Sequence, residues 1–301
     1  MKPLKIKYLN TLFLVCSIIA SAQDYIDLAK LDYAITPTNT FENSAVTTKL
    51  YEMNGNLTLP IVINDNFAFL TGATYDRITA AFDAELAEES VTGLTLKIGA
   101  NVKHNSKWSG TYMLLPKYAS GLEKITSRDF QLGAIVLMKY TKTDHFNSKF
   151  GLYGNSELFG PFIVPLFGFY YLNPSKTVEV NALLPLSIDF NYSTTKDLRF
   201  GLNFKGQVSS YAISTPTETD AKRYLEKSVR DLYTYVQYET KNGLNFQLGF
   251  GRSIGRSYRI YNEKVSLGLP LFNFGDSRTQ LNADFSDSWL FKATVFYRFG
   301  L

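Results

Sequence analysis

Cysteine and histidine are almost missing from this chain, and each shortage excludes a class of chemistry. Cys16 is the only cysteine among the 301 residues, and it lies in a segment that reads as a removable leader. The remaining chain therefore has no disulfide and no thiolate nucleophile. His104 and His145 are the only histidines, and they do not pair at the spacing of metal ligands. We expect no metal site and no cofactor.

A strong net charge and long apolar runs are also lacking. The formal charge is +4, but it falls to +1 without Lys2, Lys5 and Lys7, because 28 basic residues then oppose 27 acidic ones. This balance gives no reason to expect a nucleic-acid partner. Mean hydropathy is −0.09, which is too polar for a helical membrane protein. A transmembrane β-barrel fits better, because its lipid-facing and lumen-facing residues alternate and average out.

The first residues, MKPLKIKYLNTLFLVCSIIASAQ, have the pattern of a secretory signal peptide. A lysine-rich start precedes the apolar run LFLVCSIIA, which is too short to span about 30 Å of hydrocarbon as an anchor. The small-x-small triplet ASA then offers a cleavage site. Val15 precedes Cys16, where a lipoprotein signal needs a small residue. We therefore expect residues 1–22 to be a signal peptide and residues 23–301 to form one exported domain.

Aromatic residues are abundant, with 23 Phe and 20 Tyr, and they organise the last segment, WLFKATVFYRFGL. Its period of two indicates a strand with two different faces. One face carries Trp289, Phe291, Ala293, Val295, Tyr297, Phe299 and Leu301, and the other is dominated by Lys292, Thr294 and Arg298. The segment resembles the closing strand of Gram-negative outer-membrane barrels, although Leu301 stands where Phe is usual. The resemblance implies an insertion signal at Val295, Tyr297, Phe299 and Leu301, read by the barrel-assembly machinery.

The longest alternating stretch, 177–192, is too long for one barrel strand of about 9–11 residues. Pro185 lies in its middle and cannot donate to a strand ladder, so we expect two strands joined at Pro185. Strand direction supports the division. If the short turns at 173–175 and 194–196 lie at the same end of a barrel, an even number of strands must separate them.

Other alternating segments and turns recur along the chain, and the loops differ in length. Asn242-Gly243 is the strongest hairpin signal. We expect a long loop over 213–226 with a short helix near 221–227, and an irregular outer segment over 255–287. These features predict an all-β, closed antiparallel transmembrane β-barrel with short periplasmic turns and longer extracellular loops. The count is about 14 strands, or 12 if Gly160-Pro161 or Pro185 is only a kink.

A secreted β-sandwich also alternates, with its apolar face turned inward. The aromatic last strand, the lack of cysteine and the asymmetry between short turns and long loops favour the barrel. Charged residues that alternate with the apolar face are then candidates for the lumen wall. They are Lys97, Lys103, Lys139, Glu179, Asp189, Arg199, Lys205, Glu239, Lys292 and Arg298. They have both signs, so they can line a pore or pair across strands and fill the interior.

The mature chain as a whole resembles an uncharacterised family of outer-membrane barrels from Bacteroidota-like Gram-negative bacteria, defined only as a domain of unknown function. The resemblance rests on the leader ending SAQ, the Leu-Pro breaks in NLTLPIVIN, MLLPKY and NALLPLS, and the ending FYRFGL. It implies the fold and a location in the cell outer membrane, in contact with its lipids. It brings no catalytic residues.

Three classes of function remain, and the sequence ranks them. A passive channel or transporter for small or hydrophobic solutes fits the strand number, because about 14 strands enclose more space than side chains fill. A structural or surface-interaction barrel fits the charged loops. An outer-membrane lipid-modifying enzyme fits least, because His104 and His145 both fall in short turns at the periplasmic end. We therefore expect no enzyme, and the solute stays open.

Overall fold

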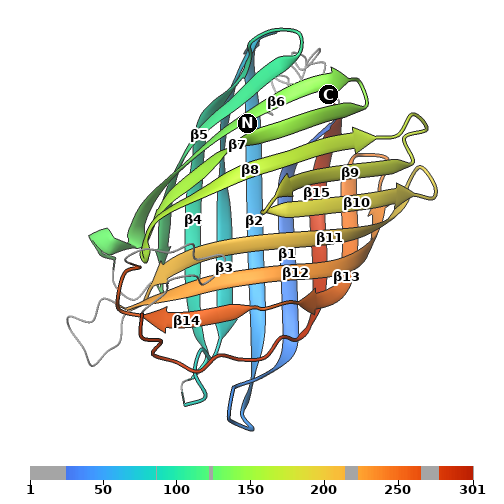
Figure 1. The fold of residues 1–301 in the computed structure, drawn as a ribbon. Helices are drawn as coiled ribbons and strands as arrows, with labels where there is room; N and C mark the ends of the chain where they lie inside the picture. The colour runs from blue at the N-terminus through green and yellow to red at the C-terminus, as the bar shows by residue number, and fades with distance from the viewer. Residues whose placement is uncertain (1–24, 86, 122–124, 214–222, 266–277, 301) are drawn as a thin grey trace, which may run out of the picture.

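The computed structural model describes residues 25–85, 87–121, 125–213, 223–265 and 278–300, which form antiparallel strands almost throughout (Figure 1). The first eight strands are β1 (Tyr25–Thr40), β2 (Thr47–Asn64), β3 (Phe67–Ala80), β4 (Glu89–Lys103), β5 (Trp108–Ser120), β6 (Phe130–Thr143), β7 (Phe146–Glu157) and β8 (Gly160–Leu172). The others are β9 (Val178–Leu184), β10 (Ser187–Ser193), β11 (Leu198–Ala212), β12 (Tyr224–Glu239), β13 (Leu244–Ser253), β14 (Ser257–Tyr261) and β15 (Trp289–Gly300). A 3₁₀ turn, η1 (Ser127–Asp129), precedes β6. No helix in the described ranges is long and apolar enough to cross a membrane.

The wall closes where the first and last strands meet. β1 pairs with β15 from Tyr25 opposite Gly300 to Ile35 opposite Phe291. Consecutive pairings lead from β1 to β13, and β13 pairs with β15. The ring therefore has fourteen strands, and β14 is added beside one end of β12. The predicted closed barrel of 14 strands is confirmed. The count of 12 is wrong, because Gly160 begins a strand and Pro185 lies in a turn.

The two ends of the barrel differ in their connections. Both termini of the ring lie at the end with short turns, which we call the short-turn end (Figure 1). The turns there are 65–66, 104–107, 144–145, 173–177, 194–197 and 240–243. The opposite, loop end carries the longer connections, as predicted. One connection differs, because only Leu158 and Phe159 join β7 to β8 at the loop end.

The hairpin of β9 and β10 stops partway along the wall. Each of its strands has 7 residues, whereas β11 beside it has 15. β9 therefore pairs with β8 only over 167–172, and β10 pairs with β11 only over 199–205. The predicted division at Pro185 is confirmed. The turn lies inside the wall and not at its rim, so one end of the hairpin does not reach the loop end.

Two expectations for the loop end are wrong. Residues 224–227 belong to β12, so no helix forms there, and 221–222 lie outside the described residues. Ser257–Tyr261, within the segment expected to be irregular, forms β14. The two strands pair with each other, from Tyr224 opposite Tyr261 to Ser228 opposite Ser257. Pairing and burial in the tertiary structure override the weak local pattern.

Large apolar side chains cover the outside of the barrel. Leu248 is 70% exposed, Ile163 64% and Phe167 63%, although all three lie on regular strands. They alternate with residues that point inward, so the exposed face is apolar along the strands and the inner face carries the charges. This is the pattern of a wall that faces hydrocarbon.

Candidate functional site

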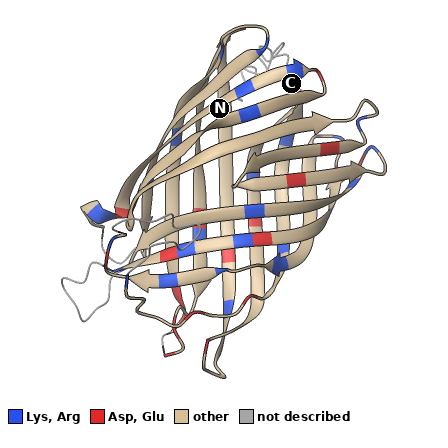
Figure 2. Ribbon diagram, in the orientation of Figure 1, with Lys and Arg blue, Asp and Glu red and all other residues tan. Residues whose placement is uncertain are grey.

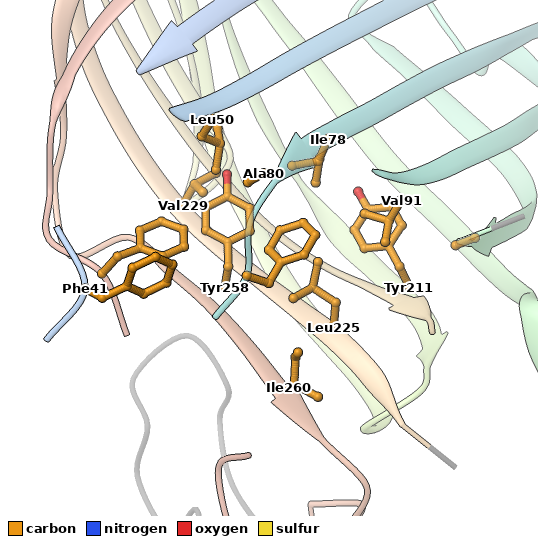
Figure 3. Close-up of a cluster of buried hydrophobic side chains, with 13 residues drawn as sticks. Phe41, Leu50, Ile78, Ala80, Val91, Tyr211, Leu225, Val229, Tyr258 and Ile260 are labelled. Atoms are coloured by element: carbon orange, nitrogen blue, oxygen red, sulfur yellow. The ribbon is translucent and has the colours of Figure 1, made fainter. Parts of the chain in front are cut away.

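Opposite walls touch at the loop end of the lumen (Figure 3). Leu50, Ile78 and Val91 point inward from β2, β3 and β4, and each is at most 2% exposed. Leu225 of β12 and Tyr258 of β14 pack against them from the other side. The strands β11, β12 and β14 thus fold onto the inner face of β2–β5. We call this contact the loop-end closure.

Polar contacts reinforce the closure. Glu52 of β2 accepts hydrogen bonds from the Lys227 ammonium, at 2.9 Å, and from the Tyr258 hydroxyl. Burial and the neighbouring Glu52 carboxylate raise the pKa of Tyr258 well above its usual value, so its hydroxyl keeps the proton that it donates. Tyr211 of β11 likewise donates to Asp76 of β3, at 2.5 Å. These bonds join β2 to β12 and β14, and β3 to β11, which are strands that do not pair with each other in the sheet.

A polar cavity of about 550 Å³ lies between the loop-end closure and the short-turn end. Its wall includes Tyr25 and Asn54 on one side and Tyr233 and Gln237 on the other. Five of the predicted lumen residues line it, and they come from four different strands. They are Glu179, Asp189, Lys205, Lys292 and Arg298.

Most charges in the polar cavity are paired with a neighbour. Arg298 forms an ion pair with Asp27, with 2.8 Å between Nε and Oδ1. Its guanidinium also stacks on the Tyr25 ring, with Cζ 3.5 Å from the ring centroid. Lys292 lies 3.4 Å from Asp32. Among the described residues, Lys205 is the one cation of this wall without a hydrogen bond or ion pair. Charges of both signs also lie next to one another along β12 (Figure 2).

Tyr235 orders the acidic side of the polar cavity by lying across a glycine. It pairs directly with Gly201 on the neighbouring strand, and a Cβ at Gly201 would overlap the tyrosine ring. The ring reaches over this position and donates its hydroxyl to Asp189, at 2.8 Å. Asn203 donates to the other oxygen of Asp189, at 2.6 Å. The carboxylate is thus fixed from two sides.

The other five predicted lumen residues lie outside the wall of the polar cavity. Lys97 reaches across β3 and donates to Asn56 and Thr58 of β2, at 2.7 and 2.8 Å. Arg199 and Glu239 form an ion pair of 2.8 Å. Lys139 lies opposite Lys149 in the register of β6 and β7, and Lys103 ends β4 on the same face as Lys97. The structure thus gathers half of the predicted set around one cavity.

A second, apolar cavity of about 280 Å³ adjoins the polar one. The two share wall residues, among them Thr74, Leu186 and Gln207. The rest of its lining is mainly apolar, with Leu115 of β5, Tyr153 of β7, and Phe162, Val164, Pro185 and Val208 beside the short hairpin. Polar exceptions include Lys97 and Lys117.

The lumen residues predicted from the sequence were chosen by their charge, so the prediction did not identify the apolar cavity. One signal for it was present, because 162–171 is apolar on both faces. Phe162, Val164 and Leu166 point inward and are at most 6% exposed, while Ile163 points outward. An inward apolar row needs an apolar neighbour inside the barrel, and the sequence alone did not identify that neighbour.

The last strand and the two histidines lie where the sequence placed them. Val295 and Tyr297 are 38% and 37% exposed on the outer face of β15, Phe299 follows on the same face, and Leu301 lies outside the described residues. His104 and His145 lie in turns at the short-turn end. Within the described ranges, no group of three or more His, Cys, Asp or Glu residues is placed to hold a metal ion.

The closed wall, the apolar outer face and the lumen with two cavities define an integral β-barrel membrane protein. The chain belongs to the family described as a domain of unknown function, DUF6268, whose model matches residues 22–297. A comparison with curated protein sequences finds no match.

Three solved structures of similar architecture are channels or porins. A deletion mutant of the monoaromatic hydrocarbon channel TodX is 10% identical, with 91% of this chain and 89% of that chain covered and a TM-score of 0.43. An outer membrane channel from Pseudomonas putida F1 is 10% identical, with 91% and 96% covered and a TM-score of 0.41. The NanC porin is 10% identical, with 89% and 98% covered and a TM-score of 0.35. At this level of similarity, the solutes of those proteins do not transfer to this chain.

Proposed function

We propose that this protein lies in the bacterial outer membrane and lets small apolar solutes pass through its interior without covalent change. The observation that carries the proposal is the apolar cavity of about 280 Å³, which adjoins the larger polar cavity inside the same wall. A cavity of about 150 Å³ with an aliphatic and aromatic lining already binds benzene. The apolar cavity therefore has room for a solute larger than a single ring.

The orientation follows from the connections. Short turns of bacterial outer-membrane barrels face the periplasm, so we assign the short-turn end to that side and the loop end to the outside. The polar cavity then leads toward the periplasm, and the loop-end closure blocks direct access from outside. The apolar outer face contacts membrane lipids, and β15 is the strand offered to the barrel-assembly machinery.

A structural or surface-interaction barrel is less well supported. Such a protein would present the segment 255–287 outward as a binding surface. Three residues of its described parts instead point into the loop-end closure, where Tyr258, Ile260 and Phe285 are at most 8% exposed. An inward segment that closes one mouth suits a barrel that controls passage.

No covalent step is part of the proposal. His104 donates to or accepts from the Tyr112 hydroxyl, at 3.0 Å, at the short-turn end of the barrel. Neither histidine lines the polar or the apolar cavity. A solute held in those cavities would not meet a histidine base.

Binding of 1-aminonaphthalene, whose emission rises in apolar surroundings, tests the proposal in detergent. The parent protein should bind it saturably, and Leu115→Asp should weaken binding at least tenfold by placing a charge in the apolar cavity. Thr111→Asp is the matched control, because it lies on the inner face of the same strand and lines neither cavity. Mobility of unboiled samples on gels checks folding. No saturable binding by the parent, or equal binding by Leu115→Asp, would overturn the proposal.

A further inference from the structure

One boundary in the barrel wall lacks a strand ladder. Because the hairpin of β9 and β10 stops early, 160–166 of β8 and 206–212 of β11 have no partner strand between them. In the described chain β8 and β11 do not pair with each other. We call this boundary the seam.

Apolar side chains fill the part of the seam that lies beside the apolar cavity. Lys205 and Tyr211 point into the lumen, so by alternation Val208 of β11 points outward, and Tyr224 of β12 lies on the same outer face. Both pack against Phe162, Val164 and Leu166, which point inward from β8. The inner face of β8 thus lies over the outer face of β11 and β12. Apolar contacts of this kind can be exchanged for contacts with an apolar solute.

The edge of β8 at the seam has few backbone donors. Leu172 donates its backbone N–H to the His145 carbonyl on the β7 side. Backbone groups alternate along a strand, so those of positions 161, 163 and 165 point toward the seam. Pro161 and Pro165 have no N–H, which leaves Ile163 as the one donor of the three. A backbone donor left unpaired beside hydrocarbon is costly, and the two prolines leave this edge with one donor instead of three.

The facing edge of β11 meets a strand at one point, where Ala212 forms a bridge with Ser120 of β5, and its other bonds go to groups outside a strand ladder. Gly206 donates its N–H to the Leu186 carbonyl of the hairpin turn, at 2.8 Å. Ser210 donates its N–H to the Glu157 carboxylate, at 2.8 Å, and its carbonyl accepts from Gln131, at 3.0 Å. Beyond that single bridge, the seam can part without losing a ladder of backbone hydrogen bonds between strands.

The seam joins two apolar environments. On the inside lies the apolar cavity, whose wall includes Phe162, Val164 and Val208. On the outside, Ile163 and Phe167 are 64% and 63% exposed on the lipid-facing side of β8. The alternative outlet at the loop end is occupied by the loop-end closure, in which β11, β12 and β14 pack against β2–β5.

We propose that uncharged apolar molecules of one or two rings move sideways between the apolar cavity and the hydrocarbon of the bilayer through the seam. The inference rests on the proposed function and adds the route and the solute class. A solute in the seam replaces the contacts of Phe162, Val164 and Val208, so passage needs no opening of the loop-end closure.

A photoreactive apolar compound tests the route. The protein is placed in phosphatidylcholine vesicles with 3-trifluoromethyl-3-phenyldiazirine, which loses dinitrogen in light and inserts into nearby C–H bonds. Mass spectrometry should find label on Leu115 and Tyr153 inside the apolar cavity, as well as on outward residues such as Ile163. Bridging Val164→Cys and Val208→Cys with dibromobimane should lower labelling of Leu115 and Tyr153 at least fivefold, with Ile163 unchanged.

The matched control is the pair Met113→Cys and Ile135→Cys, which faces across β5 and β6, where a ladder already joins the strands. Bridging this pair should leave the labelling of Leu115, Tyr153 and Ile163 unchanged. The double variant Phe162→Ala, Val164→Ala widens the seam and should raise inner labelling, which keeps the test available if the bridged protein does not assemble. Inner labelling that persists after bridging, or that does not rise in the alanine variant, overturns the lateral route. The proposed function is decided separately, by 1-aminonaphthalene binding in detergent.

Discussion

Lys227 of β12 and Glu52 of β2 form an ion pair straight across the lumen, with 2.9 Å between Nζ and Oε2. The Lys227 side chain is 1% exposed and that of Glu52 12%. Removing one partner of a buried pair costs about 3–5 kcal/mol, because the other charge stays buried without compensation. We predict a loss of that size in the free energy of unfolding for Glu52→Gln, which keeps an acceptor for Tyr258. Refolding titrations in lipid vesicles measure it.

The double variant Glu52→Gln, Lys227→Met is the control for this pair. It removes both charges, so most of the lost stability should return. Equal losses in the single and double variants would mean that the ion pair does not hold the two walls together.

The loop-end closure also predicts electrical behaviour. Parent protein in planar bilayers should be non-conducting for most of the recording, because opposite walls touch at Leu225 and Tyr258. Leu225→Ala with Tyr258→Ala removes side chains from the contact and should produce frequent conductance steps. Phe246→Ala, on the lipid-facing side of β13, should behave like the parent. Large steady conductance of the parent would contradict the closure.

Much of this architecture was predictable from the sequence, for a physical reason. A strand between lipid and lumen must alternate, so the period of two in the last strand and the proline at position 185 predicted its faces and the hairpin division correctly. The same rule placed Glu179 and Asp189 on the inner face.

The overlap of β8 on β11 was not predictable in the same way. Alternation gives the side on which Phe162 or Val208 lies, but not the strand that lies opposite. Tyr224 and Leu225 lie on opposite faces of β12, and both are buried because this part of the strand folds inside the barrel. For the same reason β14 was expected to be irregular, because its pairing with β12 depends on that inward fold.

Gly201 offers a test of how the polar cavity is ordered. A side chain at this position displaces the Tyr235 ring and breaks its hydrogen bond to the Asp189 carboxylate. Gly201→Ala should therefore lower the free energy of unfolding by about 1.5–3 kcal/mol, the usual range for a hydrogen bond to a charged group. In a Tyr235→Ala background the same substitution should cost much less. A constant cost in both backgrounds would show that the loss arises elsewhere.

The last strand carries a prediction about assembly. β15 pairs with β1 on one side and with β13 on the other, so its loss leaves two edges in lipid. Deleting residues 295–301 should abolish the heat-modifiable band and the outer-membrane fraction of the protein. Tyr297→Ala alone keeps the backbone pairing and should retain most of both. Normal levels of the truncated protein in the outer membrane would contradict the role of this strand.

The central claim, that an apolar solute occupies the interior of the barrel, is tested most directly by locating one. Crystals soaked with 1-bromonaphthalene give an anomalous signal at the bromine position. We predict one dominant peak in the apolar cavity, among Leu115, Val164 and Leu186. The peak should weaken in Leu115→Asp. Bromine found only on the lipid-facing surface, or in the polar cavity beside Lys205 and Asp189, would contradict the account.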